Sequence, residues 1–225
     1  MEQTLRIFCD FDGTISRQDT TDLVLSRLAD PEWLDVEAEW DSGRIDAATC
    51  MSRQIGLIRA PLSAIDAVLD EVELRDGFVD LLGWARRRGI RVSIVSDGVD
   101  YFIRSILSRH GIAGLPIVAN RLITLGVNRW ALEQPWRTAD CTGGSGVCKC
   151  SIVATFEDDR PLVYIGDGRS DFCVATTPDL LFATAGLERF CCTRGIAHFP
   201  FTSFAEVQSA LARIAVPARA IAALA

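Results

Sequence analysis

The sequence predicts an α/β protein in three layers, with a parallel sheet between two layers of helices and a small helical domain inserted after the first strand. Short apolar segments alternate with longer amphipathic segments along most of the chain. This alternation is typical of β-α-β units, which build parallel sheets. A separate observation predicts the inserted domain: residues 16–76 carry helical patterns without an intervening strand pattern.

The expected strands are runs rich in Val, Ile, Leu and Phe that are too short for helices. They are LRIFC (5–9), VSIVS (92–96), LPIVA (115–119), PLVYIG (161–166) and LLFAT (180–184). Helices are expected over FVDLLGWARRRG (78–89) and VDYFIRSILSRHG (99–111), because both place apolar residues at helical spacing and end in basic residues followed by glycine. Alternating apolar residues around Gly126, Val127 and Asn128 predict a β-hairpin within 117–136.

The insertion is expected to hold helices separated by Pro or Gly. Their sequences are TTDLVLSRLA, PEWLDVEAEWDSG, DAATCMSRQIGLI and PLSAIDAVLDEV. This divides the chain into a core domain of residues 1–15 and 77–225 and a cap domain of residues 16–76. The segment 204–225 predicts an Ala-rich helix that breaks at Pro217.

Composition excludes several classes of partner. The net charge of −7 and the pI near 4.9 disfavour nucleic acid, whose phosphates attract basic proteins. No apolar run approaches the roughly 20 residues that span a bilayer, and the N-terminus resembles no signal peptide. We therefore expect a cytoplasmic protein with reduced thiols among its eight cysteines. The sequence does not predict an oligomeric state.

Carboxylates follow the first predicted strand directly. Asp10 and Asp12 are two residues apart, so both side chains can point the same way. Alone, the motif D-x-D-G-T is also compatible with a polar turn. Other chemistry-bearing residues recur in order at strand or helix ends: Ser96 and Gly98, Lys149, and then Asp167 and Asp171. Ligands bind at the carboxyl ends of strands in such sheets, so we expect these groups to meet there.

Together these motifs resemble the haloacid dehalogenase-like (HAD) phosphohydrolase superfamily. The resemblance covers residues 1–15 and about 77–200. It implies a Rossmann-like parallel sheet with a cap domain, and an enzyme that hydrolyses phosphoric monoesters. Two other possibilities stay open: a non-catalytic phosphate-binding module, which would have no need for Asp12, and a phosphotransferase.

The resemblance also implies roles for the acidic residues. Mg²⁺ would be held by the side chain of Asp10, the main-chain carbonyl of Asp12 and the carboxylate of Asp167, since it prefers oxygen ligands. Asp10 would be the nucleophile that forms an aspartyl-phosphate. Asp12 would be the general acid for the leaving oxygen and then the base for water.

Phosphate binding is implied for three residues. Ser96 and the amide of Gly98 would hold phosphate oxygens, and Lys149 would neutralise charge on the nucleophile and the phosphoryl group. Asp171 would position Lys149 or support the metal site from the second layer of contacts.

The substrate should be a small phosphorylated metabolite, because a helical cap closes over the site. A cap inserted after the first motif resembles the phosphoserine phosphatase branch, and phosphoserine is an alternative substrate. The chain resembles more closely the methionine-salvage phosphatases that act on 2-hydroxy-3-keto-5-methylthiopentenyl-1-phosphate. The segments that carry this resemblance are PEW, RQIGLI, RDGF and CTGGSGVCKCSIV. The chain departs from that family at Cys150, where Pro is common, and at Asp97, where Gly is common.

Within the cap, Gln18, Asp19 and Arg53 are candidate substrate contacts, with Asp19 and Arg53 as the specificity residues. Asp19 could equally cap a helix, and Arg53 could be an exposed helical arginine. Trp33 and Trp40 are seven residues apart on one helix face, which favours packing within the cap over stacking on a ligand.

Three cysteines, Cys141, Cys148 and Cys150, surround Lys149 in a glycine-rich loop. They could bind zinc with His110 or His198 as a fourth ligand, but their spacing matches no usual zinc pattern. A reduced loop near the site is the favoured interpretation, and a disulfide that displaces Lys149 is a hypothesis. Cys9 is expected to be buried on the opposite strand face from Asp10.

Overall fold

The computed structural model describes residues 5–139, 141, 143–156 and 160–214. Its centre is a seven-stranded sheet in the order β4-β3-β2-β1-β5-β6-β7. The strands are β1 (Arg6–Cys9), β2 (Arg91–Val99), β3 (Ile117–Gly126), β4 (Arg129–Glu133), β5 (Leu162–Gly166), β6 (Leu180–Ala183) and β7 (Phe199–Pro200). All neighbouring strands are parallel except β3 and β4. The predicted fold class is therefore confirmed.

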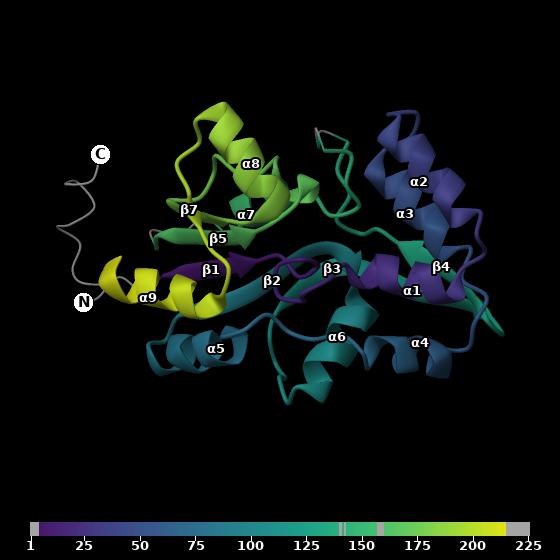
Figure 1. Ribbon diagram of the computed structural model, residues 1–225, viewed down its shortest axis with the longest axis horizontal. Helices are drawn as coiled ribbons and strands as arrows, with labels where there is room; N and C mark the ends of the chain where they lie inside the picture. The colour runs from purple at the N-terminus through teal and green to yellow at the C-terminus, as the bar shows by residue number, and fades with distance from the viewer. Residues whose placement is uncertain (1–4, 140, 142, 157–159, 215–225) are drawn as a thin grey trace.

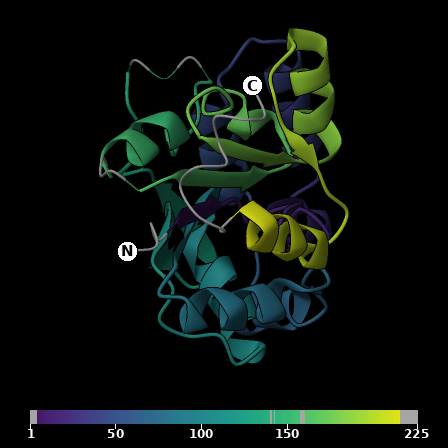
Figure 2. The same ribbon diagram turned by 90° about the vertical axis from the view of Figure 1, so that its left-hand side faces the viewer.

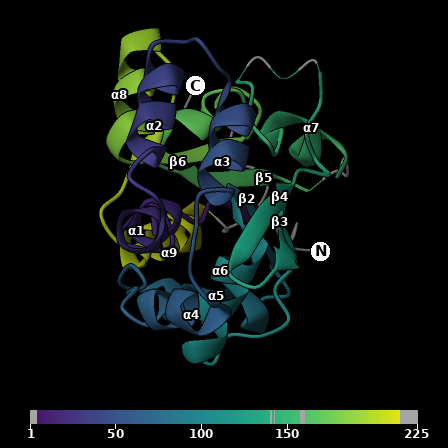
Figure 3. The same cartoon turned by 90° about the vertical axis from the view of Figure 1, so that its right-hand side faces the viewer.

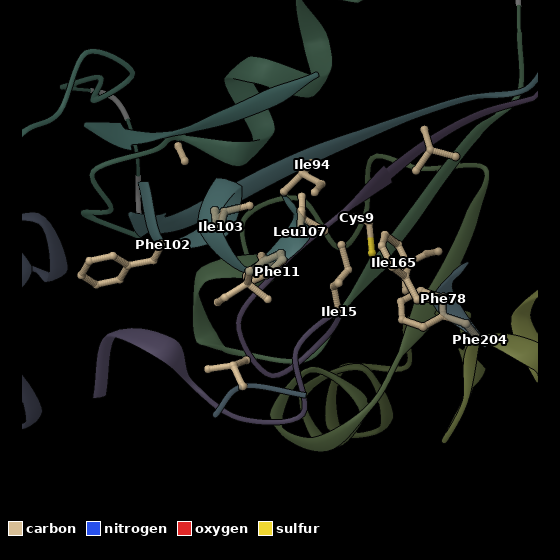
Figure 4. Packing of buried hydrophobic residues seen from close by; sticks show 14 of the residues in the cluster. Cys9, Phe11, Ile15, Phe78, Ile94, Phe102, Ile103, Leu107, Ile165 and Phe204 are labelled. Carbon is tan, nitrogen blue, oxygen red and sulfur yellow. The ribbon is translucent and has the colours of Figure 1, made fainter. Parts of the chain in front are cut away.

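The sheet lies between two layers of helices (Figures 1 and 2). One face is covered by α5 (Phe78–Arg87), α6 (Asp100–Arg109) and α9 (Phe204–Ile214), and the other by α7 (Lys149–Ala154) and α8 (Ala185–Arg194). Adjacent residues of β1 pack on opposite faces: Cys9 belongs to the first hydrophobic cluster and Phe8 to the second. Figure 4 shows Cys9 among Ile165 and Phe78 in the first cluster.

The position of β1 determines where polar groups meet. The chain runs from β1 to β2 and β3 on one side, and later places β5 and β6 on the other side. The carboxyl ends of β1, β2 and β5 therefore converge at the point where the strand order reverses. Such points leave a crevice where ligands bind in open α/β sheets.

The insertion between β1 and α5 forms four helices, as its sequence predicts. They are α1 (Thr20–Leu28), α2 (Trp33–Asp41), α3 (Ala47–Ile55) and α4 (Leu62–Leu69). The chain leaves and returns side by side, since Ser16 forms an antiparallel bridge with Leu74. Buried residues of the insertion, among them Leu25 and Leu69, belong to the same hydrophobic cluster as the sheet residue Ile94.

The predicted hairpin is confirmed in β3 and β4, whose turn places Asn128 at φ 55°. Asparagine tolerates this left-handed conformation better than most residues. The hairpin supports the insertion, because Gln134 Nε2 donates to the Ala48 carbonyl at 2.9 Å. Figure 3 shows α3 beside this hairpin and next to α2.

The C-terminal helix α9 begins at Phe204 and ends at Ile214. Pro217, where this helix is predicted to break, lies outside the described residues. Within the described ranges, no helix has the length and apolar character needed to cross a membrane.

Candidate active site

A cleft of about 530 Å³ opens between the carboxyl ends of the central strands and the helical insertion. The sheet side contributes Asp10, Asp12, Ser96, Gly98 and Asp167 to its lining. The insertion contributes Asp19, Thr21, Asp22, Glu37, Trp40 and Met51. The candidate residues of the first, second and last motifs therefore meet in one cavity, although they are up to 157 positions apart in the sequence.

Lys149 connects the two acidic motifs. Its Nζ lies 2.7 Å from Asp10 Oδ2 and 2.6 Å from Asp171 Oδ1, and its side chain is fully buried. Burial alone lowers the pKa of Lys149, but the two carboxylates outweigh it and raise the pKa above its ordinary value. The ammonium group therefore carries a positive charge directly beside Asp10.

The Asp171 carboxylate accepts four hydrogen bonds. Besides Lys149, the Tyr164 hydroxyl donates to its Oδ1 at 2.6 Å. The amides of Asp167 and Gly168 donate to its Oδ2 at 2.9 and 3.0 Å. A fully buried carboxylate with four donors is fixed in place, so Asp171 positions Lys149. No sequence pattern distinguishes Tyr164, which is one of several residues in the apolar run of a strand.

The Asp12 carboxylate contacts the start of α1 and lies close to Gly98 of β2. Its carboxylate accepts bonds from the amide and the hydroxyl of Thr20 at the start of α1. Burial, with the nearby charge of Asp19, raises the pKa of Asp12 to about 7. A Cβ on Gly98 would clash with Asp12 Oδ2, so this close approach favours glycine. No sequence spacing predicts this contact between Thr20 and Asp12.

Ser96 and Gly98 lie in the last part of β2, where its register with β3 shifts between Val95 and Val99. Ser96 is buried, and its Oγ accepts the Gly98 amide at 3.0 Å. Between them, Asp97 accepts the Val147 amide at 2.9 Å and the Asn120 side-chain amide at 3.2 Å. Asp97, one of the two residues that depart from the methionine-salvage pattern, thus connects β2 to the loop that precedes Lys149.

The acidic residues could hold a divalent cation. Carboxylate oxygens of Asp10, Asp167 and Asp171 lie within 4.8 Å of one another. Asp171 is engaged by its four donors, whereas Asp167 accepts the Thr14 hydroxyl at 2.6 Å on Oδ1 alone. A Cβ on Gly13, at φ +71°, would clash with Asp167 Oδ2, so glycine lets this carboxylate approach the backbone. Oxygen ligands of this kind fit Mg²⁺, with Asp10 and Asp167 as the available side chains.

The raised pKa of Asp167 predicts how the stability of the folded protein depends on pH and on bound metal. Burial, together with Asp171, raises the pKa of Asp167 to about 6. An acid whose folded pKa exceeds its unfolded value of about 4 stabilises the fold at low pH and loses that contribution as pH rises through the folded pKa. We expect the melting temperature without metal to fall between pH 4.5 and pH 7 because of these groups.

Mg²⁺ competes with protons for the same oxygens, so its stabilising effect should be larger at pH 7.5 than at pH 5. Thermal melts with Mg²⁺ and with chelator at both pH values measure this, and Asp167→Asn should remove most of the difference. An equal Mg²⁺ shift at the two pH values would contradict the expectation.

The insertion candidates lie in different places. Asp19 caps α1 by accepting the Asp22 amide at 2.9 Å, and it also lines the cleft, so both of its expected roles are compatible with the geometry. Gln18 is exposed and is absent from the described residues of the lining. Arg53 is likewise absent and forms two bonds with Glu39, at 2.8 and 3.1 Å. This arrangement favours the second interpretation of Arg53, which is a helical arginine paired with another residue of the insertion.

The two tryptophans of α2 have separate environments. Trp33 packs against the main hydrophobic cluster, as expected. Trp40 lines the cleft, and the Arg169 guanidinium lies 4.8 Å from its ring centroid. The expectation that both pack inside the cap is wrong for Trp40. Two helical turns carry the same face of α2 from the core to the cleft, so sequence spacing alone could not distinguish them.

The cysteines around Lys149 are free thiols. The sulfurs of Cys148 and Cys150 are 3.4 Å apart. Among the described residues, the acidic group at Asp10 is the only set of three or more side chains with metal-binding geometry, and the cysteine loop has no such set. His198, one proposed zinc ligand, lies instead 3.8 Å from the sulfur of Cys192.

Oxidation of this pair should reduce activity. Hydrogen peroxide would take two electrons from the Cys148 and Cys150 thiols, form the disulfide and leave two molecules of water. The new bond would join the residues on both sides of Lys149 and shift its ammonium group. We expect a several-fold loss of phosphatase activity after peroxide, recovery with a thiol reductant, and resistance in Cys150→Ser. Equal activity before and after peroxide would remove this hypothesis.

Comparison with known proteins agrees with this geometry. A family model for haloacid dehalogenase-like hydrolases matches residues 7–176. The chain belongs to this family. The match covers most of the described chain and includes every motif noted above, from Asp10 to Asp171.

Relatives of similar length extend the comparison across the insertion. A 2-hydroxy-3-keto-5-methylthiopentenyl-1-phosphate phosphatase of Bacillus velezensis is 30% identical over 218 residues, covering 95% of this chain and 92% of the relative. The enzyme of the same name from Geobacillus kaustophilus is 31% identical over 224 residues, covering 96% and 99%. The HAD protein described here is accordingly a phosphatase, a hydrolase of phosphoric monoesters.

Solved structures share its fold. A substrate-bound phosphoserine phosphatase aligns with a TM-score of 0.70 over 93% of this chain and 99% of that chain, at 18% identity. A phospho-aspartyl intermediate analogue of phosphoserine phosphatase aligns with a TM-score of 0.68 over 92% and 99%, at 19% identity. At this identity the likeness shows the architecture alone.

Proposed function

We propose that this HAD phosphatase hydrolyses 2-hydroxy-3-keto-5-methylthiopentenyl-1-phosphate, a step of methionine salvage. The observation that carries the proposal is the 30–31% identity to phosphatases of that name over almost the whole chain, the insertion included. Because the insertion lies over the cleft, similarity there bears on the substrate as well as on the chemistry.

In the proposed reaction, Asp10 attacks the phosphorus atom and forms an aspartyl-phosphate, while the bond from phosphorus to the leaving oxygen breaks. Support comes from its buried carboxylate, which Lys149 and the Phe11 amide hold at 2.7 Å each. When bound, Mg²⁺ would offset negative charge on the phosphoryl group, and Asp10, Asp167 and the Asp12 carbonyl would hold it.

Asp12 would protonate the leaving oxygen and then take a proton from the water that hydrolyses the aspartyl-phosphate. Its pKa of about 7 supports this role, because such a group exists in both protonation states near neutral pH. The Thr20 amide and hydroxyl would orient the carboxyl group through both steps.

Charge on the phosphoryl oxygens would be balanced by fixed donors. Lys149 would face the transferred group beside Asp10, with Asp171 holding it. Ser96 and the Gly98 amide, at the end of β2, would bind phosphate oxygens. Residues 16–76 would act as the cap domain that covers the substrate, and the rest of the chain as the catalytic domain.

A substrate panel tests the proposal. Phosphate release would be measured with the methylthiopentenyl phosphate and phosphoserine, each with Mg²⁺ and with chelator, using Asp10→Asn as the inactive blank. We expect Mg²⁺-dependent release with the highest kcat/KM for the methylthiopentenyl phosphate. A higher kcat/KM for phosphoserine would overturn the substrate assignment, and equal rates with chelator would overturn the metal requirement.

A further inference from the structure

The wall of the cleft opposite the phosphate-binding residues is acidic. Asp22 of α1 and Glu37 of α2 line it, next to Asp19 at the start of α1. We call Asp19, Asp22 and Glu37 the insertion carboxylates. Among the described lining residues, Arg169 is the one basic side chain, and its guanidinium lies over the Trp40 ring.

The insertion carboxylates lack neutralising partners. None of the three forms a salt bridge among the described residues. Glu37 is held by a neutral group instead, since the buried Gln54 donates its Nε2 to Glu37 Oε2 at 2.7 Å. Desolvation in the cleft, and then the charges of Asp19 and Glu37, raise the pKa of Asp22 to about 7, although its side chain is exposed, so its full negative charge is present only above neutral pH. Their field therefore acts on whatever occupies the cleft.

A second observation indicates a ligand at this wall. Thr21 lies between Asp19 and Asp22 in sequence, lines the same cleft and is 4% exposed. Its Oγ1 is buried and has no hydrogen-bond partner among the described residues. A buried hydroxyl without a partner is costly, and a hydroxyl or carbonyl group of a bound substrate would satisfy it.

Part of the lining is apolar. Phe172 and Phe190 are stacked with centroids 4.0 Å apart, and both line the cleft with Met51 and Trp40. An alkyl or thioether chain could pack there and bury apolar surface. The cleft thus offers a polar position at Thr21 and an apolar surface, and among the described lining residues Arg169 is the one cation that could bind a carboxylate.

We infer that the insertion carboxylates make this site select phosphate monoesters by the charge of the tail: Asp22 and Glu37 exclude substrates whose tail carries a carboxylate or second phosphate, and favour uncharged tails with a hydroxyl or carbonyl group. The inference rests on the proposed function for the phosphate end of the site. It deepens that function by assigning a specificity role to two residues that line the cleft away from the reacting atoms.

The test uses a matched pair of substrates. Glycerol 3-phosphate and 3-phosphoglycerate are close in size, but the second carries a carboxylate where the first has an uncharged alcohol. At pH 8, where Asp22 is ionised, we expect kcat/KM to be about tenfold or more higher for glycerol 3-phosphate, from repulsion by nearby charges in a partly solvated cleft. Asp22→Asn and Glu37→Gln should each reduce this ratio about threefold, and the double variant should reduce it most.

Glu39→Gln is the matched control, because it removes the same charge from the same helix at a residue paired with Arg53. It should leave the ratio unchanged. The ratio is also measured as binding, by titrating both esters into Asp10→Asn in the presence of Mg²⁺, so that slow turnover of either ester does not prevent the comparison.

Equal kcat/KM and equal affinity for the two esters in the wild-type site would overturn the inference, as would a ratio that the double variant leaves unchanged. Failure of the substrate assignment has a different signature. In that case the methylthiopentenyl phosphate is a poor substrate, while the ratio for the matched pair still responds to Asp22→Asn and Glu37→Gln.

Discussion

Asp10→Asn should abolish phosphatase activity, with a loss of at least about 10⁴-fold in kcat. Asparagine keeps the size of the side chain but supplies no carboxylate oxygen to attack phosphorus. It also weakens the proposed metal site, where Asp10 and Asp167 have the available oxygens. Steady-state phosphate release with saturating Mg²⁺ measures the effect, and acid-quenched protein from wild type should carry labelled phosphate that the variant lacks.

The matched control for Asp10→Asn is Asp70→Asn. Asp70 is an exposed carboxylate that pairs with Arg109 at 2.9 Å and is not among the described residues of the cleft lining. It should retain wild-type activity. Substantial turnover by Asp10→Asn with the same substrate would contradict the nucleophile assignment and point to direct attack by water.

Lys149→Met should impair both catalysis and folding. Methionine has a similar length but no charge, so Asp10 and Asp171 would remain as buried carboxylates without their shared cation. Removing one partner of a buried ion pair typically costs about 3–5 kcal/mol. Loss of a charge that stabilises the transition state typically lowers kcat by about 10²–10³-fold. Denaturant unfolding and single-turnover kinetics measure the two effects separately.

A double variant separates these consequences. In Lys149→Met with Asp171→Asn, one of the two unpaired charges is removed, so stability should recover by about 1–3 kcal/mol while activity stays low. If activity recovered together with stability, Lys149 would be a structural residue and not a group that faces the phosphoryl oxygens.

Local patterns in the sequence determined the fold class and the approximate positions of its elements. The strands of the core are buried on both faces and therefore appear as continuous apolar runs, and the insertion appears as uninterrupted helical spacing. The polar residues at the carboxyl ends of β1, β2 and β5 could also be grouped into one candidate site from the sequence. Parallel strands place their carboxyl ends at one edge of the sheet, so the order of motifs is enough.

Specific side-chain contacts within the site were decided by the tertiary structure. Tyr164 reaches Asp171, and Asp97 reaches the Lys149 loop, because of how side chains are aimed within the packed site. Neither contact has a period or spacing that a sequence pattern could reveal. The sequence likewise left Asp19 between two roles, and the geometry is compatible with both.

The surroundings of two residues of the insertion were also decided by the tertiary structure. Arg53 and Trp40 are ordinary helical residues in the sequence, yet the first pairs with Glu39 and the second lines the cleft. Helical spacing defines which residues share a face but not which surroundings each turn of that face meets. Those surroundings depend on how the insertion packs over the sheet, and this packing is a sum of many weak, non-directional contacts that no short segment encodes by itself.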